Sequence, residues 1–355
     1  MATIKEVAQE ARVSIGTVSN VITGSVPVSD KRQERVLAAI RKLGYHPDHV
    51  ARSLKLQRTK MLGMIISDIT NPFFSQLVRG AEDAAMEHNY LILTFNTDDR
   101  VEREKQVLSV LRSRRVDGIL LVVAPGVECP THIGETLRRG TPIVCLDRVP
   151  PGINVDSVSV DNAAAAHECV RHLLALGHTR IGIITGSLVL QTAQQRLQGY
   201  KEALAEARVT VRPEWIREGD FHTESGYRRG RELLMGRERP TALFISNNLM
   251  AIGVLKALGE LGLSCPHDVA LATFDDLPLT DVFKPHLTTV SQPAYSIGYK
   301  GADLLIQRIE SEEGPSSPVT IRFPTELKIR ESTVGYKFRH NRSGSRSSRN
   351  GTIAN

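Results

Sequence analysis

From residue 61 onward, apolar runs alternate with amphipathic stretches of helical spacing, and this alternation restricts the fold more than any other feature. The apolar runs read MLGMIIS, YLILTFN, GILLVVA and PIVCLD, followed by RIGIITG, ALFIS and VALATFDD. Near-continuous apolar strands between helices are typical of doubly wound parallel sheets that are covered on both faces. Because about 280 residues are too many for one such sheet, the pattern predicts two α/β subdomains. The break is expected near residues 155–161 and a return crossing near 287–293.

Residues 3–24, TIKEVAQEARVSIGTVSNVITG, predict two short helices joined by a tight break, with Ser14 capping the second. The apolar positions recur at helical spacing and give each helix one apolar stripe: Ile4, Val7, Ala8 and Ala11, then Val18, Val21 and Ile22. The stripes cover each other only if the helices cross, which favours a helix-turn-helix with its second helix free to enter a DNA major groove. From this stretch alone, a helical hairpin without a DNA role is an equal alternative. A third helix, in VSDKRQERVLAAIRKLGY, would complete a small all-α domain.

The charge is distributed unevenly along the chain. Residues 1–60 carry a net charge of +6 and residues 335–355 carry +5, which leaves the residues between them at −5. A basic N-terminal segment followed by an acidic middle segment indicates that the N-terminal segment binds a polyanion while the middle segment has another function. The tail is polar, rich in Ser and Arg and without periodicity, so disorder is expected there.

The chain carries none of the signals of a membrane or secreted protein. It has no run of about 18 apolar residues and no N-terminal signal peptide, which predicts a cytoplasmic protein without a membrane role. Four cysteines lie far apart without a C-x-x-C pair, which argues against a zinc site and against a disulfide framework. We expect buried free thiols.

The motifs of nucleotide-binding and hydrolytic enzymes are missing. No G-x-x-x-x-G-K-[ST], G-x-G-x-x-G or G-x-S-x-G occurs, and the spacing of His167, His172 and His178 does not place two imidazoles on one helical face. The sequence therefore predicts a binding protein with no catalytic residues, no cofactor and no metal. Detectable turnover of sugar phosphates would instead favour the alternative interpretation, an enzyme built on this fold.

Many ordered segments resemble the lactose/galactose repressor family of bacterial transcription regulators. They include the stretch 3–24, ERVLAAIRKLGYHP, ARSL, LGMIISDITNPFF, LLALGHTRIGIITG, GDFHTESGY and SNNLMAIGVLKALGELG. The similarity spans roughly residues 2–333. It implies a helix-turn-helix headpiece, a hinge helix and a core of periplasmic-binding-protein type whose two doubly wound parallel-sheet subdomains clamp a small effector. It also implies a homodimer on palindromic double-stranded operator DNA. The tail lacks the leucine heptad of the family's tetramers.

The resemblance sets the expected domain limits. The headpiece is 1–47, the hinge helix and linker 48–60, the effector-binding and dimerisation core 61–334, and the basic tail 335–355. Within the core we expect an N-subdomain of about 61–160 plus 291–318 and a C-subdomain of about 161–290 plus 319–334.

The expected DNA contacts fall in the headpiece and in the hinge. The hydroxyl groups of Ser14 and Thr17 are suited to contacts with DNA phosphates. Ile15 can contact a thymine methyl group, and Asn20 can form hydrogen bonds with adenine or with a phosphate. Gly16 has no side chain to make a contact. Relatives often carry Arg at the position of Asn20, so base discrimination by this helix looks modest. The hinge residues implied by the resemblance are Ala51, Arg52, Leu54 and Lys55, with Leu54 as a minor-groove wedge and Arg52 and Lys55 on phosphates.

The expected effector contacts stand mostly just past the carboxyl ends of predicted strands, where ligands bind in open α/β sheets. Those carried over from the family are Phe73, Phe74, Asp147, Arg148, Thr192, Arg196, Phe221, Asn247, Asp275 and Gln292. Carboxylate, amide and guanidinium groups around an aromatic platform suit a sugar or a sugar derivative. A purine is the alternative effector, given Phe221 and Arg196. Arg148 is expected either to reach an anionic group of the effector or to form an ion pair within the protein, and Phe73 and Phe74 could be plain core.

These features predict a transcription repressor whose effector controls its DNA affinity, with induction the commoner sign and co-repression the other. Asn248 stands where relatives usually have Asp, which removes a charge beside the cleft. The rival from another class is a solute-binding protein without a DNA role, against which the headpiece and the missing signal peptide both count.

Overall fold

The computed structural model describes residues 2–23, 26–45, 58–126, 130–150, 152–277, 282, 284–311 and 317–334. The chain forms two compact units, residues 1–60 and residues 61–355. The predicted hinge contacts at Ala51, Arg52, Leu54 and Lys55 lie outside the described residues, as does the basic tail. None of the helices in the described part of the chain is long and apolar enough to cross a membrane.

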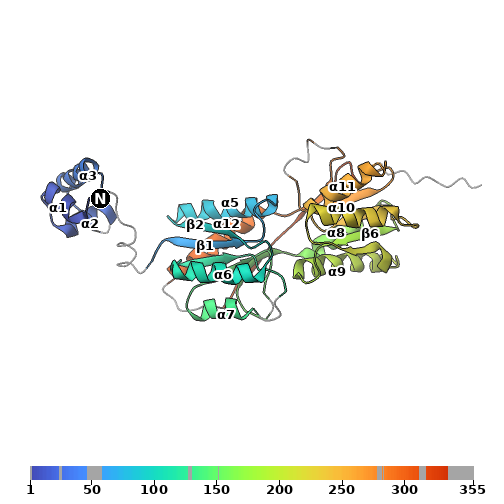
Figure 1. The fold of residues 1–355 in the computed structure, drawn as a ribbon, viewed down its shortest axis with the longest axis horizontal. Helices are drawn as coiled ribbons and strands as arrows, with labels where there is room; N and C mark the ends of the chain where they lie inside the picture. The colour runs from blue at the N-terminus through green and yellow to red at the C-terminus, as the bar shows by residue number, and fades with distance from the viewer. Residues whose placement is uncertain are drawn as a thin grey trace, which may run out of the picture. The chain divides into compact units, whose positions relative to one another are not determined.

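The first unit is a three-helix domain built on the predicted apolar stripes (Figure 1). Its helices are α1 (Ile4–Ala11), α2 (Ile15–Thr23) and α3 (Asp30–Leu43). Thr3 and Glu6 form a reciprocal capping box that fixes the start of α1. Val7, Val18 and Val36, one from each helix, are fully buried together. Each helix thus contributes one apolar face to a shared small core.

The N-subdomain of the second unit contains a parallel sheet of order β11-β5-β4-β3-β1-β2. Helices α5 and α12 cover one face, and α6 and α7 cover the other (Figure 1). The elements are β1 (Met61–Ile66), α5 (Pro72–Glu87), β2 (Leu91–Asn96), α6 (Val101–Ser113), β3 (Gly118–Leu121), α7 (Thr131–Arg138), β4 (Ile143–Leu146), β5 (Asp156–Val160), α12 (Ala294–Glu310) and β11 (Thr320–Phe323).

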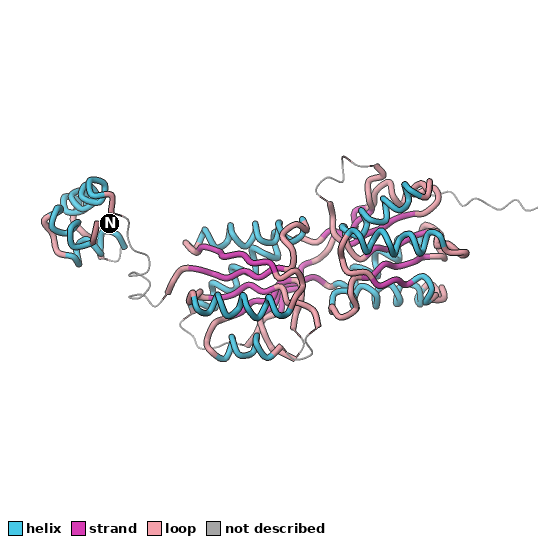
Figure 2. The backbone as a smooth tube through the Cα atoms, viewed as in Figure 1, coloured by secondary structure: helices cyan, strands magenta, loops and turns pink. Residues whose placement is uncertain are grey.

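The C-subdomain repeats this architecture with the sheet order β12-β10-β9-β8-β6-β7, in which only β12 is antiparallel to its neighbour. Figure 2 shows the strands of each sheet between layers of helices. The elements are α8 (Asn162–Ala175), β6 (Ile181–Thr185), α9 (Gln191–Glu206), a 3₁₀ turn (Pro213–Trp215), β7 (Ile216–Glu218), α10 (Thr223–Met235), β8 (Ala242–Ile245), α11 (Asn248–Glu260), β9 (Ala270–Phe274), β10 (Thr288–Ser291) and β12 (Glu326–Lys328).

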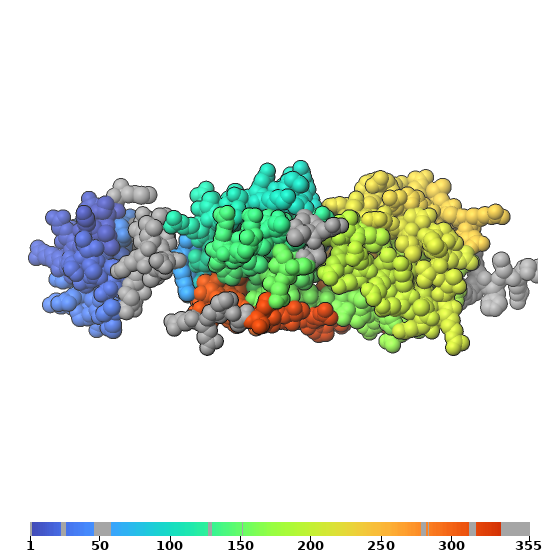
Figure 3. Space-filling view, turned by 90° about the horizontal axis from the view of Figure 1, so that it is seen from below, coloured from blue at the N-terminus to red at the C-terminus, as the bar shows by residue number. Residues whose placement is uncertain are grey.

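The chain crosses between the subdomains three times, after β5, after β10 and between β11 and β12. One expected limit is wrong: the sequence predicts that residues 319–323 belong to the C-subdomain, but β11 pairs in parallel with β5 of the N-subdomain. The physical reason is that Ser157 and Val319 join the two segments by a backbone hydrogen bond that the apolar pattern of a four-residue strand does not reveal. Figure 3 shows the two subdomains side by side in the space-filling view.

Two glycines allow α5 and α12 to pack closely in the N-subdomain. A Cβ atom added at Gly80 would lie 2.0 Å from the carbonyl oxygen of Tyr295, and one at Gly298 would lie 1.9 Å from that of Leu77. Any side chain at these two positions would push the helices apart. Their close approach fixes the crossover helix α12 against the face that carries Phe73 and Phe74.

Candidate functional site

A cavity lies between the two subdomains, at the carboxyl ends of their strands. Sixteen residues line it, and all ten of the expected effector contacts are among them: Phe73, Phe74, Asp147, Arg148, Thr192, Arg196, Phe221, Asn247, Asp275 and Gln292. The other lining residues, which the sequence did not single out, are Ser67, Asp68, Asn71, Asp99, His222 and Leu249. Ser67 directly follows β1 and Asp99 comes shortly after β2, so the rule of strand ends applied to every strand would have found these two.

On the N-subdomain side, Arg148 forms an ion pair inside the protein, which is one of its two expected roles. Its guanidinium donates to Asp99 Oδ1 at 2.6 Å and to the Val123 carbonyl at 3.4 Å. Ser67 donates to the same carboxylate oxygen at 2.6 Å. Burial alone would raise the pKa of Asp99, but the Arg148 charge and these hydrogen bonds outweigh it, so the pKa lies below its ordinary value. Asp99 is therefore a permanent anion at neutral pH.

On the C-subdomain side, Arg196 is buried and held by three contacts. Its Nε donates to Asn162 at 2.8 Å, one terminal nitrogen donates to the Ser246 carbonyl at 2.6 Å, and the guanidinium lies 3.6 Å from the centre of the Phe274 ring. Because it stacks on an aromatic ring and makes two hydrogen bonds, the planar guanidinium group of Arg196 has little freedom to move. The remaining N–H groups are the donors that this side of the cavity can offer.

Two further carboxylates interact electrostatically with Arg196. Burial raises the pKa of Asp275 to about 6, with the attraction of Arg196 and a 2.6 Å hydrogen bond from Gln292 opposing the rise. Burial likewise raises the pKa of Asp147, against the pull of Arg148 and Arg196. Since Asp147 follows β4 and Arg196 belongs to α9, this attraction spans the two subdomains.

Some polar atoms of the cavity make no hydrogen bond within the protein. Among the described residues, these are the Gln292 Oε1 acceptor and the Arg148 Nε donor, the latter 3.7 Å from Asp147 Oδ2 in an ion pair. Buried polar groups are normally satisfied, and those left over are frequent at binding sites. The cavity therefore offers at least one unmet donor and one unmet acceptor to a ligand.

The aromatic platform is Phe221, whose backbone is in the left-handed region with φ of +70°. Asn247 holds it there, because its side-chain nitrogen donates to the Phe221 carbonyl at 2.8 Å while its oxygen caps α11 through the Met250 amide. Gly186 lies under the ring, and a Cβ atom added there would be 2.0 Å from the Phe221 ring edge. Phe73 and Phe74, on the first turn of α5, are nearly fully buried yet line the same cavity.

Replacing Gly186 with alanine is expected to weaken effector binding about fivefold without unfolding the core. The new methyl group must displace the Phe221 ring from its place in the cavity, and a misplaced stacking face loses about 1 kcal/mol of contact. Calorimetric titration of effector into the variant measures this loss. Gly259→Ala in α11 is the matched control, because a Cβ atom there meets nothing within 4 Å. An unchanged effector affinity in Gly186→Ala would contradict the platform role of Phe221.

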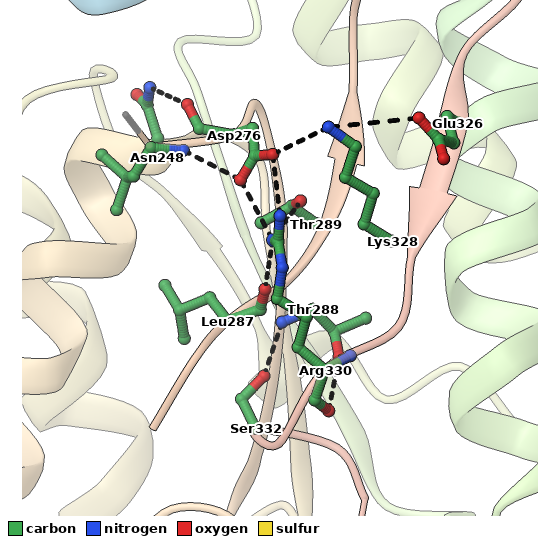
Figure 4. Close-up of polar contacts among 10 residues, drawn as sticks. Asn248, Asp276, Leu287, Thr288, Thr289, Glu326, Lys328, Arg330 and Ser332 are labelled. Atoms are coloured by element: carbon green, nitrogen blue, oxygen red, sulfur yellow. Dashed lines mark hydrogen bonds and ion pairs between the residues drawn. The ribbon is translucent and has the colours of Figure 1, made fainter. Parts of the chain in front are cut away.

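Behind the cavity wall, Asp276 is the centre of a polar cluster that the sequence did not indicate (Figure 4). Its carboxylate accepts from both terminal nitrogens of Arg330, at 3.0 and 2.9 Å, and from Lys328 at 3.1 Å. These cations lower its pKa more than burial raises it. Asn248, where relatives usually have Asp, donates to the Asp276 carbonyl at 3.3 Å. The cluster ties β12 and α11 to the strand end that carries Asp275.

In the headpiece, the expected DNA contacts lie on the exposed side of α2. The Ser14 hydroxyl accepts from the Thr17 amide at 3.1 Å, as predicted for a cap, and Ile15 is 45% exposed although it is apolar. Gly16 is exposed, and Thr17 and Asn20 are partly exposed. A helix with small and polar residues on its outer face can approach the floor of a major groove.

Comparisons with known proteins agree with this architecture. Residues 3–48 match the family of bacterial regulatory proteins named lacI, and residues 170–333 match the periplasmic binding protein-like domain. The chain is 36% identical to the HTH-type transcriptional repressor PurR of Histophilus somni (strain 129Pt), over 94% of this chain and 99% of that protein. It is 36% identical to the ribose operon repressor of Haemophilus influenzae, over 88% of this chain and 93% of that protein.

Solved structures of the same kind superpose on the chain. The Lac repressor dimer bound to operator and the anti-inducer ONPF is 28% identical, with a TM-score of 0.84 over 94% of this chain and 99% of that one. The complex of the transcriptional regulator CelR with cellobiose is 32% identical, with a TM-score of 0.71 over 94% of this chain and 100% of that one.

A helix-turn-helix headpiece joined to a two-subdomain α/β core with a polar cavity defines a ligand-controlled DNA-binding regulator. The comparisons make this specific: the chain belongs to the LacI family of bacterial regulatory proteins and is a transcription repressor. The relatives are named as repressors rather than as enzymes, which supports a regulator without catalytic activity.

Proposed function

We propose that this repressor binds a neutral, polyhydroxylated effector, a sugar, in the cavity between its subdomains. The observation that carries the proposal is the charge of the lining. Four carboxylates, Asp68, Asp99, Asp147 and Asp275, outnumber the two guanidiniums of the lining, each of which spends part of its donors on the protein. Carboxylates accept hydrogen bonds from hydroxyl groups, whereas they repel phosphates and acids. A neutral sugar therefore suits the cavity better than a sugar acid or a sugar phosphate.

The names of some similar proteins point to the same class of effector. They include a ribose operon repressor, a regulator in complex with cellobiose, and a LacI family regulator from Enterococcus faecium with bound ribose. A purine is the second candidate. It is favoured by Phe221 and by the Arg196 plane over Phe274, because flat rings stack on such faces.

Effector binding would act on DNA through closure of the cavity. The attraction between Asp147 and Arg196 crosses from one subdomain to the other, so a ligand between them alters how closely the subdomains approach. We propose that in a homodimer this changes the separation of the two hinge segments, and that the hinge helices, which we expect within the hinge and linker segment 48–60, form only at one separation. We propose that the sugar releases the repressor from a palindromic operator in the cytoplasm, with co-repression as the opposite sign.

The homodimer is supported by the exposed apolar side chains of the N-subdomain. Leu91, on the edge strand β2, and Met86, near the end of α5, are each 67% exposed. An unpaired edge strand with apolar neighbours is a surface that proteins normally cover. Covering it in a symmetric dimer would place two headpieces for the two half-sites of an operator.

The experiment that tests the proposal combines two titrations. Calorimetry with neutral pentoses, hexoses, disaccharides, their phosphates and nucleobases should detect binding of a neutral sugar and none of its phosphate. Fluorescence anisotropy then measures the affinity for an operator selected from random duplexes, with and without that sugar. Tight binding of a nucleobase would establish the second candidate. An operator affinity that stays constant on saturation with the sugar would refute the coupling, and ligand binding without DNA binding would point to a solute-binding protein.

A further inference from the structure

The two subdomains are joined along one edge of their sheets. In the orders β11-β5-β4-β3-β1-β2 and β12-β10-β9-β8-β6-β7, the crossings involve only β5, β10, β11 and β12, which lie together at the first-named ends. In the described part of the chain, no crossing leaves from β2 or β7, the strands at the opposite edges. Two domains joined in this way turn about the few residues of their crossings. The cavity therefore opens and closes at residues 97–100 after β2 and 219–222 after β7, which we call the mouth.

On the N-subdomain side of the mouth, Asp99 has one carboxylate oxygen to spare. Both of its hydrogen bonds, from Arg148 and from Ser67, go to Oδ1 at 2.6 Å. Within the described ranges, Oδ2 accepts no hydrogen bond. The side chain is 25% exposed and lines the effector cavity. Asp99 is thus a fixed anion that can accept a further hydrogen bond.

On the C-subdomain side, His222 has a fixed backbone and an unbonded imidazole. It is the N-cap residue of α10, its amide donates to Asp220 at 2.9 Å, and its carbonyl accepts from the Ser225 hydroxyl at 3.1 Å. The imidazole lines the cavity, is exposed, and makes no hydrogen bond to any residue that the structure describes. The ring can therefore change its rotamer without disturbing the helix.

The two sides of the mouth face each other closely. Burial raises the pKa of Asp99, and the charge of Arg148, the two hydrogen bonds and, as the smallest contribution, the charge of His222 lower it. Beside the mouth, a Cβ atom added at Gly126 of the N-subdomain would lie 3.7 Å from Val189 Cγ1 of the C-subdomain. We therefore expect a small rotation to bring the imidazole to the spare oxygen of Asp99.

We propose that His222 and Asp99 form a latch across the mouth, in which the imidazole donates a hydrogen bond to Asp99 Oδ2 when the subdomains close around the effector. The inference rests on the proposed function, because closure around a small effector brings the two groups together. The latch holds the closed arrangement without touching the effector. A hydrogen bond to an ionised carboxylate is stronger than one between neutral groups. Its loss should therefore speed effector release and leave capture nearly unchanged.

The test measures both rate constants by surface plasmon resonance, with the tightest-binding neutral sugar of the calorimetric panel, beginning with ribose. In His222→Ala the dissociation rate should rise about tenfold, which corresponds to one such hydrogen bond, while the association rate stays within about twofold. In His222→Glu the dissociation rate should rise about threefold further, because two facing carboxylates repel each other. The control, His267→Ala, changes an exposed histidine at the amino end of β9, away from the cavity, and should match the parent.

His222→Glu separates a latch from a direct contact with the sugar. A carboxylate also forms hydrogen bonds with sugar hydroxyls. A dissociation rate in this variant no higher than that of His222→Ala would assign His222 to the sugar and overturn the latch. A parental rate in His222→Ala would overturn it as well, while the proposed function would stand.

The parent protein tests the function on which the latch depends. If it bound no sugar of the panel, the proposed function would fail, and with it the closure that the latch requires. A parental melting temperature of the effector-binding core shows that each variant is folded.

Discussion

Replacing Arg196 with methionine is expected to lower effector affinity about 100-fold while the effector-free protein still binds its operator. Arginine has five N–H donors, and Asn162 and the Ser246 carbonyl occupy two of them, so the others are available to a ligand. Hydrogen bonds from a charged donor contribute about 1.5–3 kcal/mol each, and the loss of one or two gives this factor. Calorimetry and anisotropy on the same preparation measure the two affinities.

The structural cost of this change has to be separated from the lost contact. Without Arg196, the buried Asp147 and Asp275 lose the cation that attracts both, and their pKa values should rise further. Removing one partner of a buried charge group is strongly destabilising, by about 3–5 kcal/mol. Arg196→Lys keeps the positive charge but lacks the planar guanidinium group with its several N–H donors. We expect it to restore the melting temperature while effector affinity stays low. Full effector affinity in the methionine variant would show that Arg196 does not touch the ligand.

The expected cavity residues come from the family resemblance, and several of them also obey a local rule. Asp147 and Asp275 come directly after β4 and β9, and the carboxyl ends of parallel strands converge at one edge. What the rule cannot supply is the partner of each group. Arg148 could have served either the ligand or the protein, and only the folded chain brings Asp99 within 2.6 Å of it from 49 positions away.

Other parts of the fold depended on contacts between distant segments. The polar cluster around Asp276 unites α11, β10 and β12, and no sequence spacing links Arg330 to it. The assignment of β11 failed for the same reason, because strand pairing rather than composition decides which sheet a short strand joins. The left-handed backbone of Phe221 is a tertiary constraint imposed by Asn247, and a phenylalanine in a loop gives no sign of it.

Placing an aspartate at Val18 is expected to abolish specific operator binding, by about 100-fold or more, and to leave effector affinity within about twofold. Val18 is completely buried in the headpiece, between α1 and α3. A carboxylate there has no buried cation to pair with among the described core residues of that domain, and burying it costs several kcal/mol. A domain of this size has little stability to lose, so the headpiece should unfold.

The effector-binding core should stay folded in this variant, because it forms a separate compact unit with its own apolar clusters. Val26→Asp is the matched control: it adds the same charge to the same domain at a position that is 51% exposed, so only a small electrostatic loss of DNA affinity is expected. Anisotropy with the selected operator, calorimetry with effector and a two-step thermal melt together distinguish the cases. If Val18→Asp lost effector binding and operator binding to the same degree, the two units would fold as one, and DNA reading could not be assigned to the headpiece alone.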